Sequence, residues 1–290
     1  MSVTLRDRDG RAVLRFERRL AHPQAKVWRA VTTPAELAHW FPAAMQYEPR
    51  TGAPITFRFA EVEETSHGEV TELEPPRVFA FLWEGEQLRI ELTPDGPDAC
   101  LLVFTHSFDD RPGAASFATG WTACLDALQA ALDGVPVHAT GGWESMHDQH
   151  EAYVKLFDLD QGTSEETPDG WQVRFERQLT RPVDDIWTTL TASGAPIAGS
   201  APPRPFTTRV FPAGAITALD APTSLEYKWM SGERPAGRVR WQLSAGPGGA
   251  ARLVLTQTGP RELADERAGA LIVWQAHIEQ LATQRQGVSP

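Results

Sequence analysis

The sequence repeats itself once, and this internal repeat constrains the fold more than any other feature. Phe-Glu-Arg-Arg-Leu at 16–20 is matched by Phe-Glu-Arg-Gln-Leu at 175–179, an offset of 159 residues. Pro23 recurs at the same offset as Pro182. Two collinear copies of one folding unit are the simplest explanation, because chance seldom keeps both the order and the spacing of such blocks.

The repeat continues towards the end of both copies with changes of offset. Trp83 falls on Trp229 at an offset of 146, and Trp121 falls on Trp274 at an offset of 153. The drop from 159 to 146 means that the second copy has lost about 13 residues between its first and middle blocks. A proline-rich stretch, 195–205, stands there instead. The second copy is therefore an abbreviated version of the first.

Each copy has the same predicted order of elements. A strand comes first, at 12–20 and 172–179, and a helix opened by proline follows, at 23–32 and 182–191. Strands with alternating apolar residues come next, as in Leu88, Ile90 and Leu92. An amphipathic helix closes each copy, with apolar residues at three- and four-residue steps: Phe117, Trp121, Cys124, Leu125, Leu128 and Leu132, then Ala270, Trp274, His277, Ile278 and Leu281. The pattern predicts an α+β fold, with one long helix on an antiparallel sheet in each copy.

The domain boundaries follow from the composition between the copies. We expect a first domain at 1–158, which includes an extra helix at 143–157 beyond a loop at 134–142. The stretch 159–170 is polar and rich in turn residues, so it is predicted to be a linker. The second domain then occupies 171–290.

Composition and charge narrow the class of function. Hydrophobic residues make up 41% of the 290 residues, enough for real cores. The net charge of −11 arises within residues 1–160, which hold 14 basic and 25 acidic residues. Such a surface repels phosphate backbones and anionic lipids, so nucleic acid and membranes are not expected as partners. Two cysteines, no long apolar segment and no secretion signal lead us to expect a cytoplasmic protein.

Several short motifs together resemble a known superfamily. They are Thr-Pro-Ala-Glu-Leu at 33–37, Trp-Phe at 40–41, Gly-Glu-Val at 68–70, Pro-Pro-Arg at 75–77, Thr-His-Ser at 105–107 and Gly-Trp-Thr-Ala-Cys-Leu at 120–125. This set resembles the SRPBCC (START/Bet v 1-like) superfamily, in particular bacterial proteins of the AHSA1-like group, over 12–134 well and over 172–284 weakly. The resemblance implies two helix-grip domains, each a curved antiparallel sheet wrapped on a long C-terminal helix with an apolar cavity between them. A fold alone does not assign a function.

In such a fold the first copy would hold a cavity lined by aromatic residues. The candidate ligand-binding residues are Trp40, Phe41, Phe57, Phe59, Phe81, Trp83, Phe104, His106, Phe117, Trp121 and Cys124. The alternative is that these side chains simply fill a core, which is the commoner role of large apolar residues. The second copy lacks a match to the Trp40 stretch, so we expect any binding site in the first copy and a structural role for the second.

Candidates for catalysis or metal binding are weak. His106 is the one weak catalytic candidate, because its ordinary pKa suits proton transfer, although a structural or ligand-orienting role is favoured. Cys124 stands among apolar residues, where a thiol is usually inert. His147 and His150 have helical spacing, but no third metal ligand is indicated, so a packing role is favoured. No cofactor motif is present, and we expect neither a cofactor nor a bound metal.

Three functions follow as expectations. The first is binding of a hydrophobic or aromatic small molecule in the first domain without a strong catalytic set. The second is an enzyme of the polyketide cyclase/aromatase kind with His106 as proton carrier, and the third is a chaperone-associated interaction module. The strand at 78–83 is apolar on both faces, so a homodimer contact or a pairing of the two domains is expected over its outer face.

Overall fold

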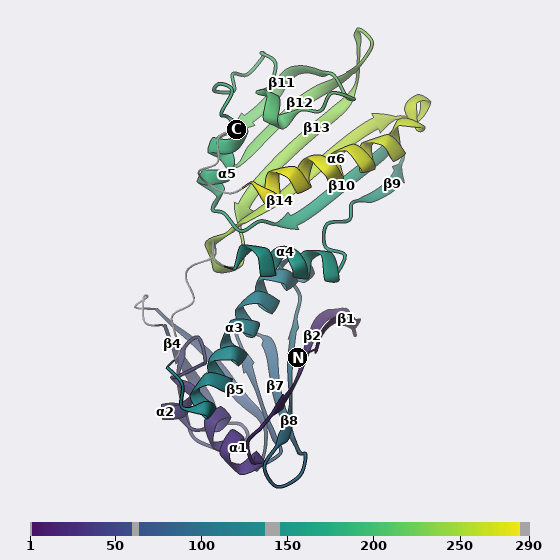
Figure 1. Cartoon of the computed structure of the whole chain (residues 1–290). Helices are drawn as coiled ribbons and strands as arrows, with labels where there is room; N and C mark the ends of the chain where they lie inside the picture. The colour runs from purple at the N-terminus through teal and green to yellow at the C-terminus, as the bar shows by residue number, and fades with distance from the viewer. Residues whose placement is uncertain (1, 60–63, 137–145, 285–290) are drawn as a thin grey trace. The chain divides into compact units, whose positions relative to one another are not determined.

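The computed structural model of the chain describes residues 2–59, 64–136 and 146–284. The chain divides into two compact units, Met1–Gly141 and Gly142–Pro290. Each unit contains one antiparallel sheet and one long helix (Figure 1). This arrangement confirms the predicted α+β class with two helix-grip units.

The first unit has an eight-stranded sheet in the order β1-β2-β8-β7-β6-β5-β4-β3. Its strands are β1 (Ser2–Arg8), β2 (Arg11–Leu20), β3 (Ala44–Tyr47), β4 (Pro54–Arg58), β5 (Thr65–Glu74), β6 (Val78–Trp83), β7 (Glu86–Pro94) and β8 (Cys100–Phe108). Its helices are α1 (Gln24–Thr32), α2 (Pro34–Leu37) and α3 (Ala114–Asp133). Helix α3 buries one face of the predicted stripe, and it ends where Gly134 adopts the left-handed conformation that glycine accommodates.

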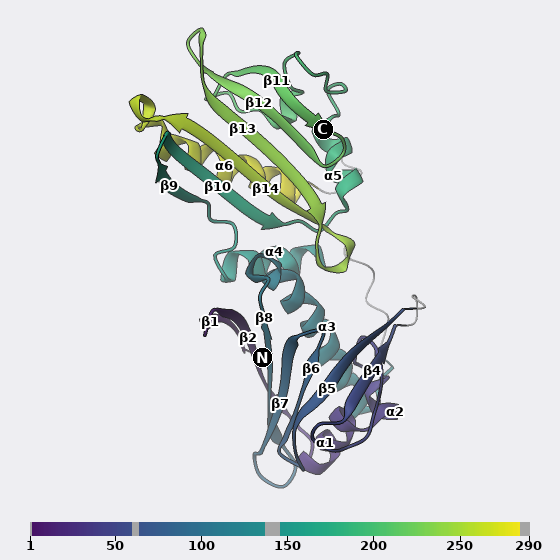
Figure 2. The ribbon, with the colours of Figure 1, turned by 180° about the vertical axis from the view of Figure 1, so that it is seen from behind.

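The second unit has a six-stranded sheet in the order β11-β12-β13-β14-β10-β9. Its strands are β9 (Thr163–Thr167), β10 (Gly170–Gln178), β11 (Ala213–Asp220), β12 (Ser224–Ser231), β13 (Arg234–Ala245) and β14 (Ala251–Pro260). Its helices are α4 (His147–Leu156), α5 (Val183–Leu190) and α6 (Glu266–Thr283). Figure 1 shows α6 in front of this sheet, and Figure 2 shows the strands in front of the helix from the opposite side.

The two sheets have the same strand order once their elements are matched. Read from β9 to β11, the second sheet repeats the first from β1 to β5, and the register agrees residue by residue. Leu14 pairs with His106 in the first sheet, and Val173 pairs with Gln257 in the second, at the offsets found in the sequence. Among the described residues, the second unit has no strands that correspond to β3 and β4. The structure therefore agrees with a tandem repeat whose second copy is shortened.

Two expectations about the middle of the chain need correction. The helix at 147–156 belongs to the second unit, not to a first domain ending at 158, because Glu151 pairs with Arg177 on β10 and Lys155 with Glu279 on α6. The expected linker 159–170 contains strand β9, which pairs with β10. Its Thr-Ser-Glu-Glu-Thr sequence reads as a loop because it is an exposed, charged edge strand, whose order comes from backbone pairing. Trp143 and most of the expected loop at 134–142 lie outside the described residues.

The outer face of β6 is covered from within its own sheet. Ala80 is 1% exposed and pairs with Glu72 on one side and Arg89 on the other. Arg89 and Glu72 form an ion pair that spans the small alanine between them. Long charged side chains can cover apolar surface with their stems while their heads reach water. The ion pair of Arg89 and Glu72 therefore helps to cover Ala80 within the first unit.

Candidate functional site

Aromatic side chains from three different elements of the first unit meet around Phe41. Its ring centroid lies 6.3 Å from Phe57 on β4, 6.0 Å from Phe81 and 5.6 Å from Trp83 on β6, and 5.7 Å from Trp121 on α3. These separations are in the range of favourable aromatic pairs. These residues gather because the turn after α2 brings Phe41 between the sheet and α3.

The gathered residues fall into two groups by exposure. Phe57, Phe81 and Phe104 are at most 1% exposed, so they form the filled core that was the alternative to a cavity. Phe59, Trp83, Phe117 and Cys124 are only half-buried. Period-two alternation predicts which face a residue takes but not how deep it lies, which is why the sequence did not separate core from rim.

Trp40 faces a different place from the one expected. Its indole N–H donates to the Ala30 carbonyl at 3.0 Å, which holds the ring against α1. A hollow of about 330 Å³ lies on this side of the unit, between α1, α2 and the end of α3. Its lining is Lys26, Arg29, Ala30, Glu36, Trp40, Ala131, Leu132, Asp133 and Gly134. Trp40 thus lies between this polar hollow and the aromatic cluster. The ring centroids of Trp40 and Phe41 are 5.6 Å apart, and the two rings are perpendicular.

His106 lies at the centre of a hydrogen-bonded chain. The Trp121 indole N–H donates to His106 Nδ1 at 3.1 Å, and His106 Nε2 lies 2.8 Å from Glu86 Oε2. An indole nitrogen only donates, so Nδ1 must be the acceptor and Nε2 must carry the proton that is donated to Glu86. The imidazole is 2% exposed, and its orientation is fixed from both sides.

Glu86 is a candidate site residue that sequence reasoning missed. It is 20 residues from His106 in the chain and begins β7, where it pairs with Trp83 across the β6–β7 hairpin. Its side chain keeps 34% of its exposure, whereas that of His106 keeps 2%. The charged group of the pair therefore reaches the surface, and the buried imidazole supports it. Only the strand register brings the two together, because no short motif contains both.

Cys124 does not supply a nucleophile. Burial raises the pKa of its thiol to about 12, so the thiol stays protonated near neutral pH. One helical turn away, a Cβ added to Gly120 would meet no described atom within 4 Å. The half-buried stripe formed by Phe117, Gly120 and Cys124 therefore borders open space on α3.

The second unit keeps one part of this arrangement. Leu88 pairs with His106 in the first unit, and Val239 pairs with Gln257 in the second, so Gln257 takes the place of His106. The Trp274 indole N–H donates to Gln257 Oε1, at 2.5 Å. An acceptor for the helix tryptophan is thus a feature of both copies, which indicates a structural role for this bond.

The rest of the arrangement is absent from the second unit. Gly237 takes the position of Glu86, and an added Cβ there would lie 1.9 Å from the Thr258 carbonyl oxygen and 2.5 Å from Trp229 Nε1. Trp229, the counterpart of Trp83, is 2% exposed and donates to Thr258 O at 2.7 Å. The tryptophan side chain and the backbone occupy the space that a carboxylate side chain would need.

The stretch that replaces the Trp40 region in the second unit also fills its core. Phe206 is fully buried, and its carbonyl accepts hydrogen bonds from Tyr227 Oη at 2.9 Å and Trp241 Nε1 at 3.1 Å. Phe211 packs edge-on against Trp229 with ring centroids 5.4 Å apart. The shortened connection therefore contributes core aromatics of its own.

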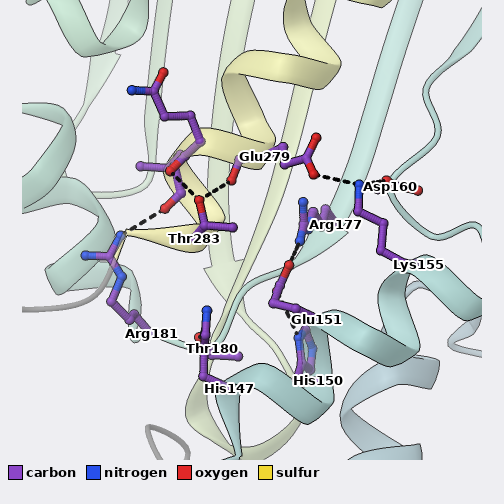
Figure 3. Close-up of polar contacts among 12 residues, drawn as sticks. His147, His150, Glu151, Lys155, Asp160, Arg177, Thr180, Arg181, Glu279 and Thr283 are labelled. Carbon is purple, nitrogen blue, oxygen red and sulfur yellow. Dashed lines mark hydrogen bonds and ion pairs between the residues drawn. The ribbon is translucent and has the colours of Figure 1, made fainter.

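The histidines of α4 take part in a polar network of the second unit (Figure 3). His147 Nδ1 lies 2.8 Å from Thr180 Oγ1, and His150 Nδ1 lies 3.2 Å from Glu151 Oε1. Glu151 also pairs with Arg177 on β10. Neither histidine faces a cluster of metal ligands, and within the described ranges no group of three or more such residues could hold a metal ion.

No described helix combines the length and the apolar character that crossing a membrane requires. A second hollow, of about 450 Å³, lies in the second unit. Arg174, Asp220, Thr223, Ser224, Arg240, Gln242, Leu243, Ser244, Val254 and Thr256 line it. It is open and polar, so it differs in kind from the half-buried aromatic residues Phe59, Trp83 and Phe117 of the first unit.

Comparisons with known proteins bear on the first unit and on the whole chain. The chain is similar to CalU16 from Micromonospora echinospora, with 21% identity and a TM-score of 0.43 over 53% of this chain and 95% of that one. It is similar to EF2215 from Enterococcus faecalis, described as a conserved protein of unknown function, with 19% identity and a TM-score of 0.45 over 53% and 91%. DynU16, described as a protein in the dynemicin biosynthetic locus, has 18% identity and a TM-score of 0.42 over 93% and 97%.

No curated protein matches the sequence. Residues 21–133 match the family model described as activator of Hsp90 ATPase homolog 1-like protein. The matched range contains the helices α1, α2 and α3 and the strands β3 to β8, which together carry the aromatic cluster and the His106 chain. Residues 21–133 of the first unit are therefore similar to the AHSA1-like proteins that the sequence motifs resemble.

Proposed function

We propose that the first unit binds a hydrophobic or aromatic small molecule at the rim formed by Phe59, Trp83 and Phe117. The observation that carries this proposal is the half-burial of these three rings: Trp83 stacks on the buried Phe57, Phe59 packs on Trp83, and Phe117 packs on the buried Phe108. Partly exposed aromatic surface of this kind favours ligand binding. A ligand ring that covers it removes apolar surface of both the protein and the ligand from water.

The internal repeat supports the choice of the first unit. In the second unit the counterpart of Trp83 is buried, and Ala270 stands at the position of Phe117. The first unit thus has half-buried large rings at positions where the second unit has a buried tryptophan and an alanine. We propose a structural role for the second unit on this basis.

Isothermal titration calorimetry of the full chain with naphthalene and 2-methoxynaphthalene tests the proposal. We expect saturable binding of one molecule per chain. Phe117→Ala should weaken binding about 5- to 30-fold, because an aromatic contact removed from a binding surface costs about 1–2 kcal/mol. Ile272→Ala is the matched control, since Ile272 is an apolar residue on the long helix of the other unit and is 71% exposed. Absence of saturable binding would reject the proposal.

A second candidate, catalysis of the polyketide cyclase/aromatase kind, is favoured by one observation. The 2.8 Å contact between Glu86 and His106 joins a carboxylate and an imidazole, the two groups most often used for proton transfer. Since both ring nitrogens of His106 are engaged, the proton would pass to Glu86 at the surface. Incubation with a poly-β-ketone thioester, followed by mass spectrometry, tests this. Cyclised product that disappears in Glu86→Gln supports catalysis, and unchanged starting material argues against it.

The third expectation, an interaction module associated with a chaperone, rests on the family description alone. Saturable binding of an Hsp90-type protein, together with no uptake of the naphthalene probes, would favour it over the two proposals above.

A further inference from the structure

The side chain of Glu86 places a carboxylate on the same face of the sheet as Trp83 of the aromatic rim. Glu86 is half-buried, and its only hydrogen bond within the described residues is the one that it accepts from His106 through Oε2. Nothing in the described part of the chain donates to its Oε1. An ionised carboxylate has about four acceptor positions and no donor, so this oxygen is free to accept from a ligand.

Arg11, a cation beside the β6–β7 hairpin, is already engaged. Arg11 Nε pairs with Asp109 at 2.8 Å, and its Nη2 donates to the Gly85 carbonyl at 3.1 Å. It thus lies beside the β6–β7 hairpin without pairing with Glu86. The unit as a whole carries 13 basic and 20 acidic residues in 1–141, a net charge of −7. The surroundings therefore attract a cation and repel an anion.

The ring next to Glu86 adds a second attraction for a cation. Trp83 pairs with Glu86 across the hairpin, so the two side chains lie on the same face of the sheet. Trp83 is half-buried, and its indole N–H donates to Ser66 Oγ at 2.8 Å, which fixes the ring. A tryptophan face attracts an ammonium group by about 0.5–2 kcal/mol, depending on how far the site is desolvated.

We propose that the ligand of the first unit is an aromatic amine in its protonated form, with its ammonium group on Glu86 Oε1 and its ring along Trp83. This inference rests on the proposed binding function and specifies the chemistry of the ligand. His106 orients the carboxylate through Nε2, and Trp121 fixes the tautomer that makes this donation possible. His106 and Trp121 are positioning residues.

The second unit supports the assignment by its differences. It keeps the helix tryptophan and an acceptor, Gln257, but has Gly237 in place of the carboxylate. Its Trp229 donates its indole N–H to the backbone carbonyl of Thr258 and lies buried. The copy that lacks the acid thus has a buried tryptophan in place of the half-buried one, so the acid and the half-buried ring occur together in one copy and not in the other.

Three probes of matched shape test this inference by calorimetry at pH 7 and low salt: 2-naphthylmethylamine, 2-ethylnaphthalene and 2-naphthoate. We expect the amine to bind at least 10-fold more tightly than the neutral probe, and 2-naphthoate to bind most weakly. Glu86→Gln should abolish the preference for the amine, and Glu86→Asp should keep part of it. Glu84→Gln is the matched control, because Glu84 is an exposed acid on the same hairpin.

The outcomes separate the inference from the function beneath it. If none of the probes binds saturably, the proposed function fails and the inference fails with it. If the three probes bind equally, or if Glu86→Gln keeps the preference, the site takes aromatic ligands but the amine assignment is overturned. An equal loss in Glu84→Gln and Glu86→Gln would also overturn it, because general surface charge would then explain the preference. If Glu86→Gln does not fold, contacts in NMR spectra of the wild type between the probe's methylene protons and the Trp83 indole decide the question, and their absence overturns the assignment.

Discussion

Two substitutions of His106 should differ sharply in stability, because only one of them keeps an acceptor for Trp121. The Trp121 indole N–H reaches His106 Nδ1 at 3.1 Å inside the core. His106→Gln supplies an amide oxygen at the same register position, as Gln257 does for Trp274 in the second unit. His106→Leu supplies apolar volume and leaves the indole N–H without a partner.

The size of the difference follows from the burial of the tryptophan. Trp121 is 7% exposed, so water cannot readily replace the lost acceptor. An unpaired buried donor costs about 1–3 kcal/mol, and we take about 2 kcal/mol for this bond. For a unit of this size 1 kcal/mol corresponds to roughly 4 °C in melting temperature. The leucine variant should therefore melt about 8 °C below the glutamine variant.

Differential scanning calorimetry of the full chain measures this, with the two units resolved as separate transitions where they unfold independently. Gln257→Leu is the matched perturbation of the second unit, and it should lower the transition of that unit by a similar amount. If the leucine and glutamine variants of His106 melt within 2 °C of each other, the bond contributes little and the reasoning from burial is refuted.

Three further predictions test other parts of the structure. Gly68→Ala should destabilise the first unit by more than about 2 kcal/mol, since an added Cβ would lie 1.9 Å from the Leu82 carbonyl oxygen; an unchanged denaturation midpoint would contradict this. Cys124 should resist iodoacetamide in the native state at pH 8 and react in urea, because burial raises its thiol pKa to about 12; rapid native labelling counted by mass spectrometry would refute this. Burial opposes ionisation of Glu151, but its interactions with His150 and Arg177 outweigh burial and lower its pKa. Ionised Glu151 therefore stabilises the folded protein above the pKa of the unfolded state. This stabilisation is lost as the pH falls through the lowered pKa of the folded state. Urea midpoints between pH 7 and 3 should thus fall less steeply in Glu151→Gln, and equal slopes would count against it.

Much of the fold follows from local patterns in the sequence. The proline-opened helices lie within one residue of their predicted starts, at Gln24 and Val183, because proline sets the backbone angle of a first helical turn. Alternation predicted the strands, and the offsets of the repeat predicted which strands correspond. The polar strand β9 escaped prediction, since its order comes from pairing with β10 and not from its side chains.

The candidate site was only partly visible in the sequence. Trp83 and Phe117 were among the expected lining residues, and so were Phe57 and Phe104, although the structure separates the first two, at the rim, from the last two, in the core. A side chain's depth depends on what the rest of the chain packs over it. Alternation along one strand carries no such information.

The sequence by itself determined the two copies, the order and type of most elements, and the face of the sheet and helix on which the aromatic residues gather. Those properties depend on periodicity and spacing, which act over a few neighbouring residues. Only the tertiary structure decided that Glu86 meets His106, that α4 joins the second unit, and that the rim remains exposed in one copy alone. These depend on strand register and on packing between segments distant in the chain, where one residue of shift would turn a side chain to the other face.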